Sequence, residues 1–222
     1  VAAAVKERAA AVRVAYVMTD EASLPLAVSR IVPKLITAGL LDATITSGQA
    51  FGGETEAVNL YSALLAARHV LHADTAVVAI GPGIPGTATP FGHSGIAQGQ
   101  ALNAAVALGG VPIAVLRLSF ADERPRHVPV SHQTVTALGT VALAPALVAV
   151  PALDEPMGTR VDAALEASGI WARHERRPVR LETLPDTRGV QTRTMGRGAE
   201  EDPAFFYAAA AAGRLAAEIA AG

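Results

Sequence analysis

The stretch TAVVAIGPGIPGTATPFGHSG, residues 75–95, decides how we interpret the fold. Residues 75–80 are mostly apolar and predict a buried strand, whereas residues 81–95 are rich in glycine and proline and predict a loop. A helical pattern follows at residues 96–108. A strand that opens into a glycine-rich loop and then a helix commonly builds an anion site, because glycine lets the backbone approach a ligand and the helix N-terminus offers free N–H groups.

Apolar runs alternate with helical patterns along most of the chain. Helices between strands imply right-handed βαβ units, so we predict one α/β domain over residues 1–222, a three-layer Rossmann-like sandwich with a mainly parallel sheet of five or six strands. The expected strands are 12–18, 43–46, 75–80, 112–118 and 147–150, with a candidate edge strand at 179–184. The expected helices are 24–39, 54–71, 96–108, 131–142, 157–168 and 203–221, and residues 186–201 are expected to form a mobile loop.

Composition narrows the class of protein. Hydrophobic residues make up 51% of the chain, but each long apolar run is broken by a charge, a glycine or a proline, so we expect no membrane span. The surplus of apolar residues favours a subunit interface and hence a homo-oligomer. No secretory pattern is visible, which favours a cytoplasmic location. The chain has no cysteine, so thiol catalysis, disulfides and cysteine–metal clusters are excluded.

Polar residues gather where the predicted strands end. In open α/β sheets, ligands bind outside the carboxyl ends of the strands. Four of the five strand ends are polar or glycine-rich here, at residues 19–20, 47–49, 81–95 and 119–132, whereas the strand interiors are almost wholly apolar. This contrast predicts a ligand site at that edge of the sheet.

The glycine-rich loop contains the formal pattern G-x-G-x-x-G. A dinucleotide site also requires an acid about 20 residues further on, but the next acid is Asp122, and a Walker loop requires a lysine that is missing before Thr87. We therefore assign no cofactor. A tight turn in which glycine and proline only shape the backbone is the alternative to an anion site. The candidate ligand-binding residues of the loop are Gly81, Gly83, Gly86, Thr87 and Thr89.

The densest polar run lies at residues 119–134. Arginine offers planar, bidentate donors to phosphate or carboxylate, and histidine can act as acid, base or ligand. A solvated loop whose charges pair with one another is the alternative. The candidate ligand-binding residues here are Ser119, Asp122, Arg124, Arg126 and Ser131, with Arg117 as a further source of positive charge.

Four residues are candidates for acid–base catalysis: Asp20, His93, His127 and His132. With Glu56 they could hold a divalent metal by residue type, although no pair has the i,i+4 spacing of a strong metal motif. Asp20 could instead cap the helix that follows it. Acids at the start of the expected helix 54–71 suit the helix dipole.

Long motifs occur at residues 15–20, 43–59, 79–95, 119–134 and 194–206. They resemble an uncharacterised bacterial family known only as a domain of unknown function. The resemblance spans nearly the whole chain, but it carries no activity and transfers no catalytic residue. It implies that this chain is the C-terminal α/β domain of a longer protein and lacks an N-terminal segment. The family pattern has a histidine where Gln133 stands here, which weakens a metal site built on paired histidines.

The sequence therefore predicts an enzyme-like domain that binds a small anionic molecule, phosphate or carboxylate, at the strand ends. The alternative is a non-catalytic ligand-sensing or oligomeric assembly module, which the apolar composition and the alanine-rich last helix would suit. Nucleic-acid binding through the arginines of residues 173–180 is disfavoured, because the net charge of −2 gives no basic field. An enzyme requires the His, Asp and Arg side chains to converge at one pocket.

Overall fold

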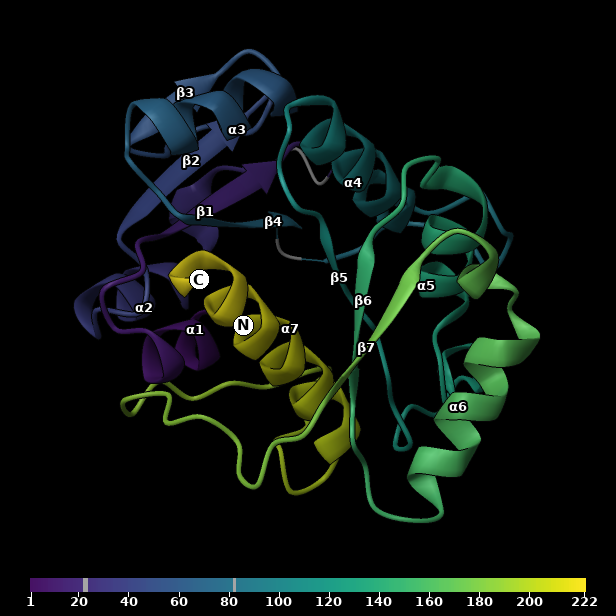
Figure 1. Cartoon of the computed structure of the whole chain (residues 1–222). Helices are drawn as coiled ribbons and strands as arrows, with labels where there is room; N and C mark the ends of the chain where they lie inside the picture. Colours follow the sequence, from purple (N-terminus) through teal and green to yellow (C-terminus); the bar gives the residue numbers. More distant parts are fainter. Residues whose placement is uncertain (22–23, 82) are drawn as a thin grey trace.

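The chain forms two parallel β-sheets with helices packed on them (Figure 1). The computed structural model describes residues 1–21, 24–81 and 83–222. The strand orders are β3-β2-β1-β4 and β5-β6-β7. The strands are β1 (Val14–Thr19), β2 (Ala43–Ser47), β3 (Thr55–Ala57), β4 (Thr75–Ile80), β5 (Ile113–Val115), β6 (Leu147–Pro151) and β7 (Glu175–Val179). The helices are α1 (Ala2–Arg8), α2 (Val32–Thr37), α3 (Leu60–His69), α4 (Ala97–Ala107), α5 (His132–Thr136), α6 (Met157–Ala167) and α7 (Pro203–Ala221).

The parallel α/β class is confirmed, but the strands divide between a four-stranded and a three-stranded sheet instead of forming the one sheet that we expected. The division falls between β4 and β5, and β5 is shorter than predicted. Pro112 precedes it and has no N–H to give to a ladder. After β5, the N–H of Arg117 donates to Oγ1 of Thr134 at 3.1 Å. These two local features end the strand on either side.

The first sheet is covered by helices on both faces. Along β1, Val14 and Met18 pack with α1, α2 and α7, whereas Ala15 and Val17 pack with α3. This alternation follows from the period of two residues in a strand. Both faces of β1 are therefore buried, which explains why its sequence is almost continuously apolar.

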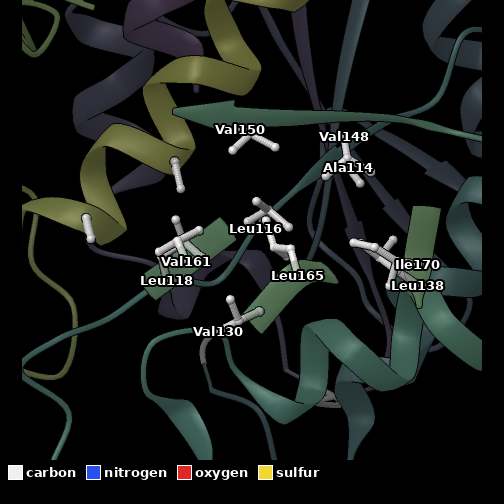
Figure 2. Close-up of a cluster of buried hydrophobic side chains, with 12 residues drawn as sticks. Ala114, Leu116, Leu118, Val130, Leu138, Val148, Val150, Val161, Leu165 and Ile170 are labelled. Carbon is white, nitrogen blue, oxygen red and sulfur yellow. The ribbon is translucent and has the colours of Figure 1, made fainter. Parts of the chain in front are cut away.

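The largest cluster of buried hydrophobic side chains among the described residues packs on the second sheet and is shown in Figure 2. Val148 and Val150 of β6 pack there with Val161 and Leu165 of α6. Ala149 points to the other face of β6 and packs against α7. The small side chain at Ala149 suits the alanine-rich surface of that helix.

The helix α7 lies against strands of both sheets, β4 of the first and β5, β6 and β7 of the second, and crosses between them in Figure 1. It also packs along α1. Its bounds agree with the helix predicted at residues 203–221. Among the described residues, α7 alone is long and apolar enough to cross a membrane, a test that a buried core helix also passes.

The predicted helix at residues 54–71 is wrong in its first part, which forms β3 and pairs with β2. The acids there serve local contacts instead of a helix dipole. The Glu54 carboxylate accepts the N–H of Thr44 at 3.1 Å, and the Glu56 carboxylate accepts the N–H of Gly52 at 2.9 Å. The helix begins after Asn59, which caps it.

Two other predicted elements differ in extent. The described part of residues 24–39 holds a 3-10 turn at Leu26–Val28 and the short helix α2, instead of one long helix. The last strand is β7, which ends where the candidate strand 179–184 was expected to begin. Residues 186–201 contain no helix or strand, as expected of a loop. Two arginines anchor this loop: Arg188 donates to the carbonyl of Ala38 at 2.8 Å, and Arg197 pairs with Asp122.

Close packing of α4 against the π-helical turn Ala137–Val141 gives a first prediction. A Cβ placed on Gly99 would lie 2.6 Å from the carbonyl oxygen of Ala137. We expect Gly99→Ala to lower the free energy of unfolding by about 1–3 kcal/mol, because overpacking forces the backbone apart. Gly139→Ala is the matched control, since its nearest contact would be 3.9 Å away. Urea unfolding followed by circular dichroism measures both, and equal stability of the two variants would contradict the packing described.

Candidate functional site

Three histidines that are separated in the sequence come together beside α5. His93 stands near the end of the glycine-rich loop, His127 in a 3-10 turn after β5, and His132 at the start of α5. The ring centroids of His93 and His132 are 5.2 Å apart, and those of His127 and His132 are 5.1 Å apart. The polar segments that follow β4 and β5 therefore meet at these rings.

The ring of His127 is enclosed and hydrogen-bonded. Its side chain is 1% exposed, and Nδ1 lies 2.7 Å from Oγ of Ser131. Ser131 also accepts the N–H of Gln133 and so caps α5. Burial, and then the nearby charges of Arg117 and Arg124, lower the pKa of His127 to about 4. His127 is therefore neutral at pH 7 and holds the loop to α5.

His93 and His132 are the members of this group with unused polar atoms. His93 is 4% exposed, and among the described residues neither of its ring nitrogens has a hydrogen-bond partner of good geometry, although the carbonyl of Pro90 lies near enough to interact with the ring. Nε2 of His132 is likewise buried without a partner in that part of the chain. Burial lowers the pKa of both side chains; the carbonyl of Pro90 partly opposes the shift at His93, and the charges of His93 and Arg126 add to it at His132.

An ion-pair network lies next to the histidines, centred on Asp122. The carboxylate of Asp122 accepts two hydrogen bonds from Arg124, from Nε and from Nη2, each at 2.9 Å. Arg117 and Arg197 approach the same carboxylate at 3.6 and 3.7 Å. The hydrogen bond from Arg124 holds the pKa of Asp122 well below its usual range. Asp122 and Arg124, predicted to bind ligand, therefore bind each other.

A second carboxylate supports the network from the start of α7. Asp202 is 1% exposed and accepts Oγ–H of Ser119 at 2.6 Å and the N–H of Phe120 at 3.1 Å. Arg197 lies 3.4 Å from the same side chain. The hydroxyl of Ser119, another predicted ligand group, thus ties the loop after β5 to α7.

We call the set formed by these residues the arginine–histidine cluster. Its members are His93, Arg117, Asp122, Arg124, Arg126, His127, His132, Arg197 and Asp202. Four guanidinium groups stand against two carboxylates, and the three imidazoles are neutral, so the cluster carries an excess of positive charge. Such a site favours an anion over a cation.

The metal interpretation gains no support from this arrangement. In the described ranges, no group of three or more His, Cys, Asp or Glu side chains could hold a metal ion. Glu56, which the metal interpretation required, accepts a backbone hydrogen bond at β3 instead. The four guanidinium groups near the histidines would also repel a divalent cation.

Most of the glycine-rich loop is exposed and closes on itself. The hydroxyls of Thr87 and Thr89 lie 2.7 Å apart, and the N–H of Thr87 donates to the carbonyl of Gly92 at 2.6 Å. Pro82 lies outside the described residues. The predicted ligand-binding residues Gly83, Gly86, Thr87 and Thr89 are exposed, and Gly81 is buried.

Asp20, the fourth candidate catalytic residue, lines a different cavity from His132. This cavity of about 460 Å³ lies among the ends of β1 and β2 and the first turns of α3 and α4. The Asp20 carboxylate accepts the N–H of Gln49 at 2.9 Å, which joins the ends of the two strands. The four candidate catalytic residues therefore divide into a histidine group and Asp20.

A profile described as a protein of unknown function, DUF3866, matches residues 1–213. The chain belongs to the DUF3866 family. No curated protein and no solved structure matches it. The profile spans both sheets and the whole arginine–histidine cluster.

Sequence reasoning missed two roles in this DUF3866 chain. Asp202 directly precedes the helix predicted at residues 203–221, but its side chain makes no cap hydrogen bond and accepts one from Ser119 instead. Arg197 lies in the segment predicted to be a mobile loop, and it joins Asp122 to Asp202. Nothing in the spacing of the arginines in residues 186–201 identified carboxylates of the chain itself as their partners.

Proposed function

We propose that this DUF3866 chain binds a small anion, phosphate or carboxylate, at the arginine–histidine cluster, and that the cluster exchanges a proton with the bound molecule. The observation that carries the proposal is the pair His93 and His132. Buried ring nitrogens without partners are costly in a folded protein, so they commonly mark a ligand or catalytic position. The excess of arginine around them sets the sign of the ligand's charge.

Some residues of the cluster and its surroundings hold the site in place, and others are available to bind the ligand. Ser119, Asp122, Arg124 and Ser131 are engaged with other protein groups and keep the loop after β5 in place. Arg126 is exposed and makes no ion pair with any residue that the structure describes. Together with His93 and His132, it supplies the groups with capacity left for a ligand.

Neutral imidazole suits the proposed proton exchange. A histidine whose pKa lies below the ambient pH carries one N–H donor and one lone pair, so it can accept a proton from a ligand or donate a hydrogen bond to it. Burial and the neighbouring charges keep His132 in that state at neutral pH. The proposal names general acid–base catalysis as the reaction class.

We also propose that the two sheets are halves of one Rossmann-like three-layer sandwich in a cytoplasmic homo-oligomer. The packing of α7 on strands of both sheets supports the first part. Exposed apolar side chains at the start of α3 support the second: Val58 is 86% exposed, Tyr61 48% and Leu65 44%. The same side chains favour the alternative function, a non-catalytic assembly module.

The proposed site predicts that inorganic phosphate or acetate binds with one molecule per chain. A hydrogen bond to a charged group contributes about 1.5–3 kcal/mol, so we expect Arg126→Gln to weaken binding at least tenfold. Arg30 is an exposed arginine beside α2, so Arg30→Gln should leave the affinity for the anion unchanged. Isothermal titration calorimetry at low salt measures both.

Two results would contradict the proposal. If neither anion binds the wild-type chain, the proposed site does not exist. If Arg126→Gln and wild type bind with equal affinity, the anion binds somewhere other than at the arginine–histidine cluster. If neither anion binds and light scattering shows a stable oligomer, the assembly module becomes the better account.

A further inference from the structure

A groove of about 550 Å³ opens beside the arginine–histidine cluster. It lies between the loop around Pro90, the segment 125–130, α5 and the second half of α6. Its volume falls within the range of sites for small organic molecules. The proposed anion site accounts for Arg126 and His132 in its lining and leaves the rest of the groove without a role.

The lining of the groove combines apolar and polar groups. Val128, Val130, Val135 and Ala164 contribute apolar walls, and Thr136 and Ser168 add hydroxyls. Among the described lining residues, Arg126 is the one that carries a charge. His132 also lines the groove and feels the charge of Arg126, and its Nε2 has no partner among the described residues.

We propose that the groove holds the apolar chain of a monoanionic carboxylate, with the carboxylate at Arg126 and His132. The inference rests on the proposed function, because it takes the anion site as the place of the head group. The single guanidinium among the described lining residues balances one negative charge, which favours a carboxylate over a doubly charged phosphate. Neutral His132 can donate an N–H to the second carboxylate oxygen.

The apolar walls predict how affinity changes with chain length. Each methylene removed from water on binding contributes about a fourfold gain in affinity. Affinity for straight-chain carboxylates should therefore rise about fourfold per carbon from acetate to hexanoate, and level off once the groove is full. Hexanol, which has the same chain length as hexanoate but no charge, should bind at least tenfold more weakly than hexanoate.

The test is a calorimetric titration of the full chain with acetate, butanoate, hexanoate and octanoate. Ala167 lines the groove and is exposed at the last residue of α6, so Ala167→Leu narrows the groove without disturbing the core. Ala107→Leu is the matched control, because Ala107 is the exposed last residue of α4 and lies away from the groove lining. We expect Ala167→Leu to weaken octanoate binding at least tenfold and acetate binding less than twofold, and Ala107→Leu to change neither.

The outcomes separate this inference from the proposed function. If acetate binds but affinity does not rise with chain length, the anion site stands and the groove proposal is wrong. If affinity rises equally for Ala167→Leu and wild type, the chain lies elsewhere and the groove proposal is again wrong. If no carboxylate and no phosphate binds, the anion site itself is absent.

Discussion

Asp122→Asn is expected to lower the free energy of unfolding by about 3 kcal/mol. The side chain of Asp122 is 3% exposed and is the shared partner of Arg117, Arg124 and Arg197. Removing one partner of a buried ion pair costs about 3–5 kcal/mol, because it leaves charge without compensation. We take the lower end of that range because the three arginines are partly exposed. The corresponding fall in melting temperature is about 6–12 °C for a chain of this size.

Asp162→Asn provides the matched control. Asp162 also pairs with an arginine, Arg176, at 2.7 Å, but both side chains are well exposed. Exposed pairs contribute about 0–1 kcal/mol, so the control should unfold within about 1 kcal/mol of wild type. Urea unfolding at pH 7 compares the variants. Equal stability of Asp122→Asn and Asp162→Asn would show that the Asp122 network does not hold the loop after β5 in place.

Acidification from pH 7.5 to 4.5 is expected to reduce the free energy of unfolding by about 2–3 kcal/mol through His127 alone. Its folded pKa of about 4 lies below the ordinary value of 6.5. His127 therefore becomes protonated near pH 6.5 in the unfolded chain, but only near pH 4 in the folded chain. The contribution of neutral His127 to the free energy of unfolding is fully present above pH 6.5. It is lost as the pH falls toward 4, at about 1.4 kcal/mol per pH unit. His93 and His132 have lowered pKa values too, so they add to the loss in the same direction.

Comparison of variants assigns this pH dependence to the cluster. His127→Asn removes the titrating group and should unfold with a smaller loss between pH 7.5 and 4.5 than wild type. His69→Gln, a change on the exposed end of α3, should keep the wild-type loss. Denaturant midpoints measured across that pH range provide the comparison. A wild-type stability that is flat over this interval would contradict the buried, neutral state of His127.

Local patterns predicted much of the fold. The apolar runs that form β1, β2, β4 and β6 can be recognised as strands from their own residues, without knowledge of the strands they pair with. Their bounds agree closely with the prediction. The helices α4, α6 and α7 also agree, because glycine and proline mark their ends. By contrast, β3 depends on its pairing with β2, and no local pattern reports that pairing.

The candidate site shows the same division. The residue types in the segment 119–134 indicated chemistry, and the structure brings three of them to His93 or to one another. Their separate roles depend on contacts across the fold. The pairing of Ser119 with Asp202 joins residues that are 83 positions apart in the sequence, and the placement of Asp20 in another cavity depends on how β1 and β2 end.

The proposed anion site at His93 and His132 can be tested most directly by imidazole NMR. The chain has six histidines, and long-range ¹H–¹⁵N spectra resolve the ring nitrogens of each. In a titration with acetate at pH 7.5, we predict saturable shifts of the ring nitrogens of His93 and His132, with His69 and His72 unchanged. Ring nitrogens of His93 and His132 that do not move, or that move no more than those of His69 and His72, would contradict the account.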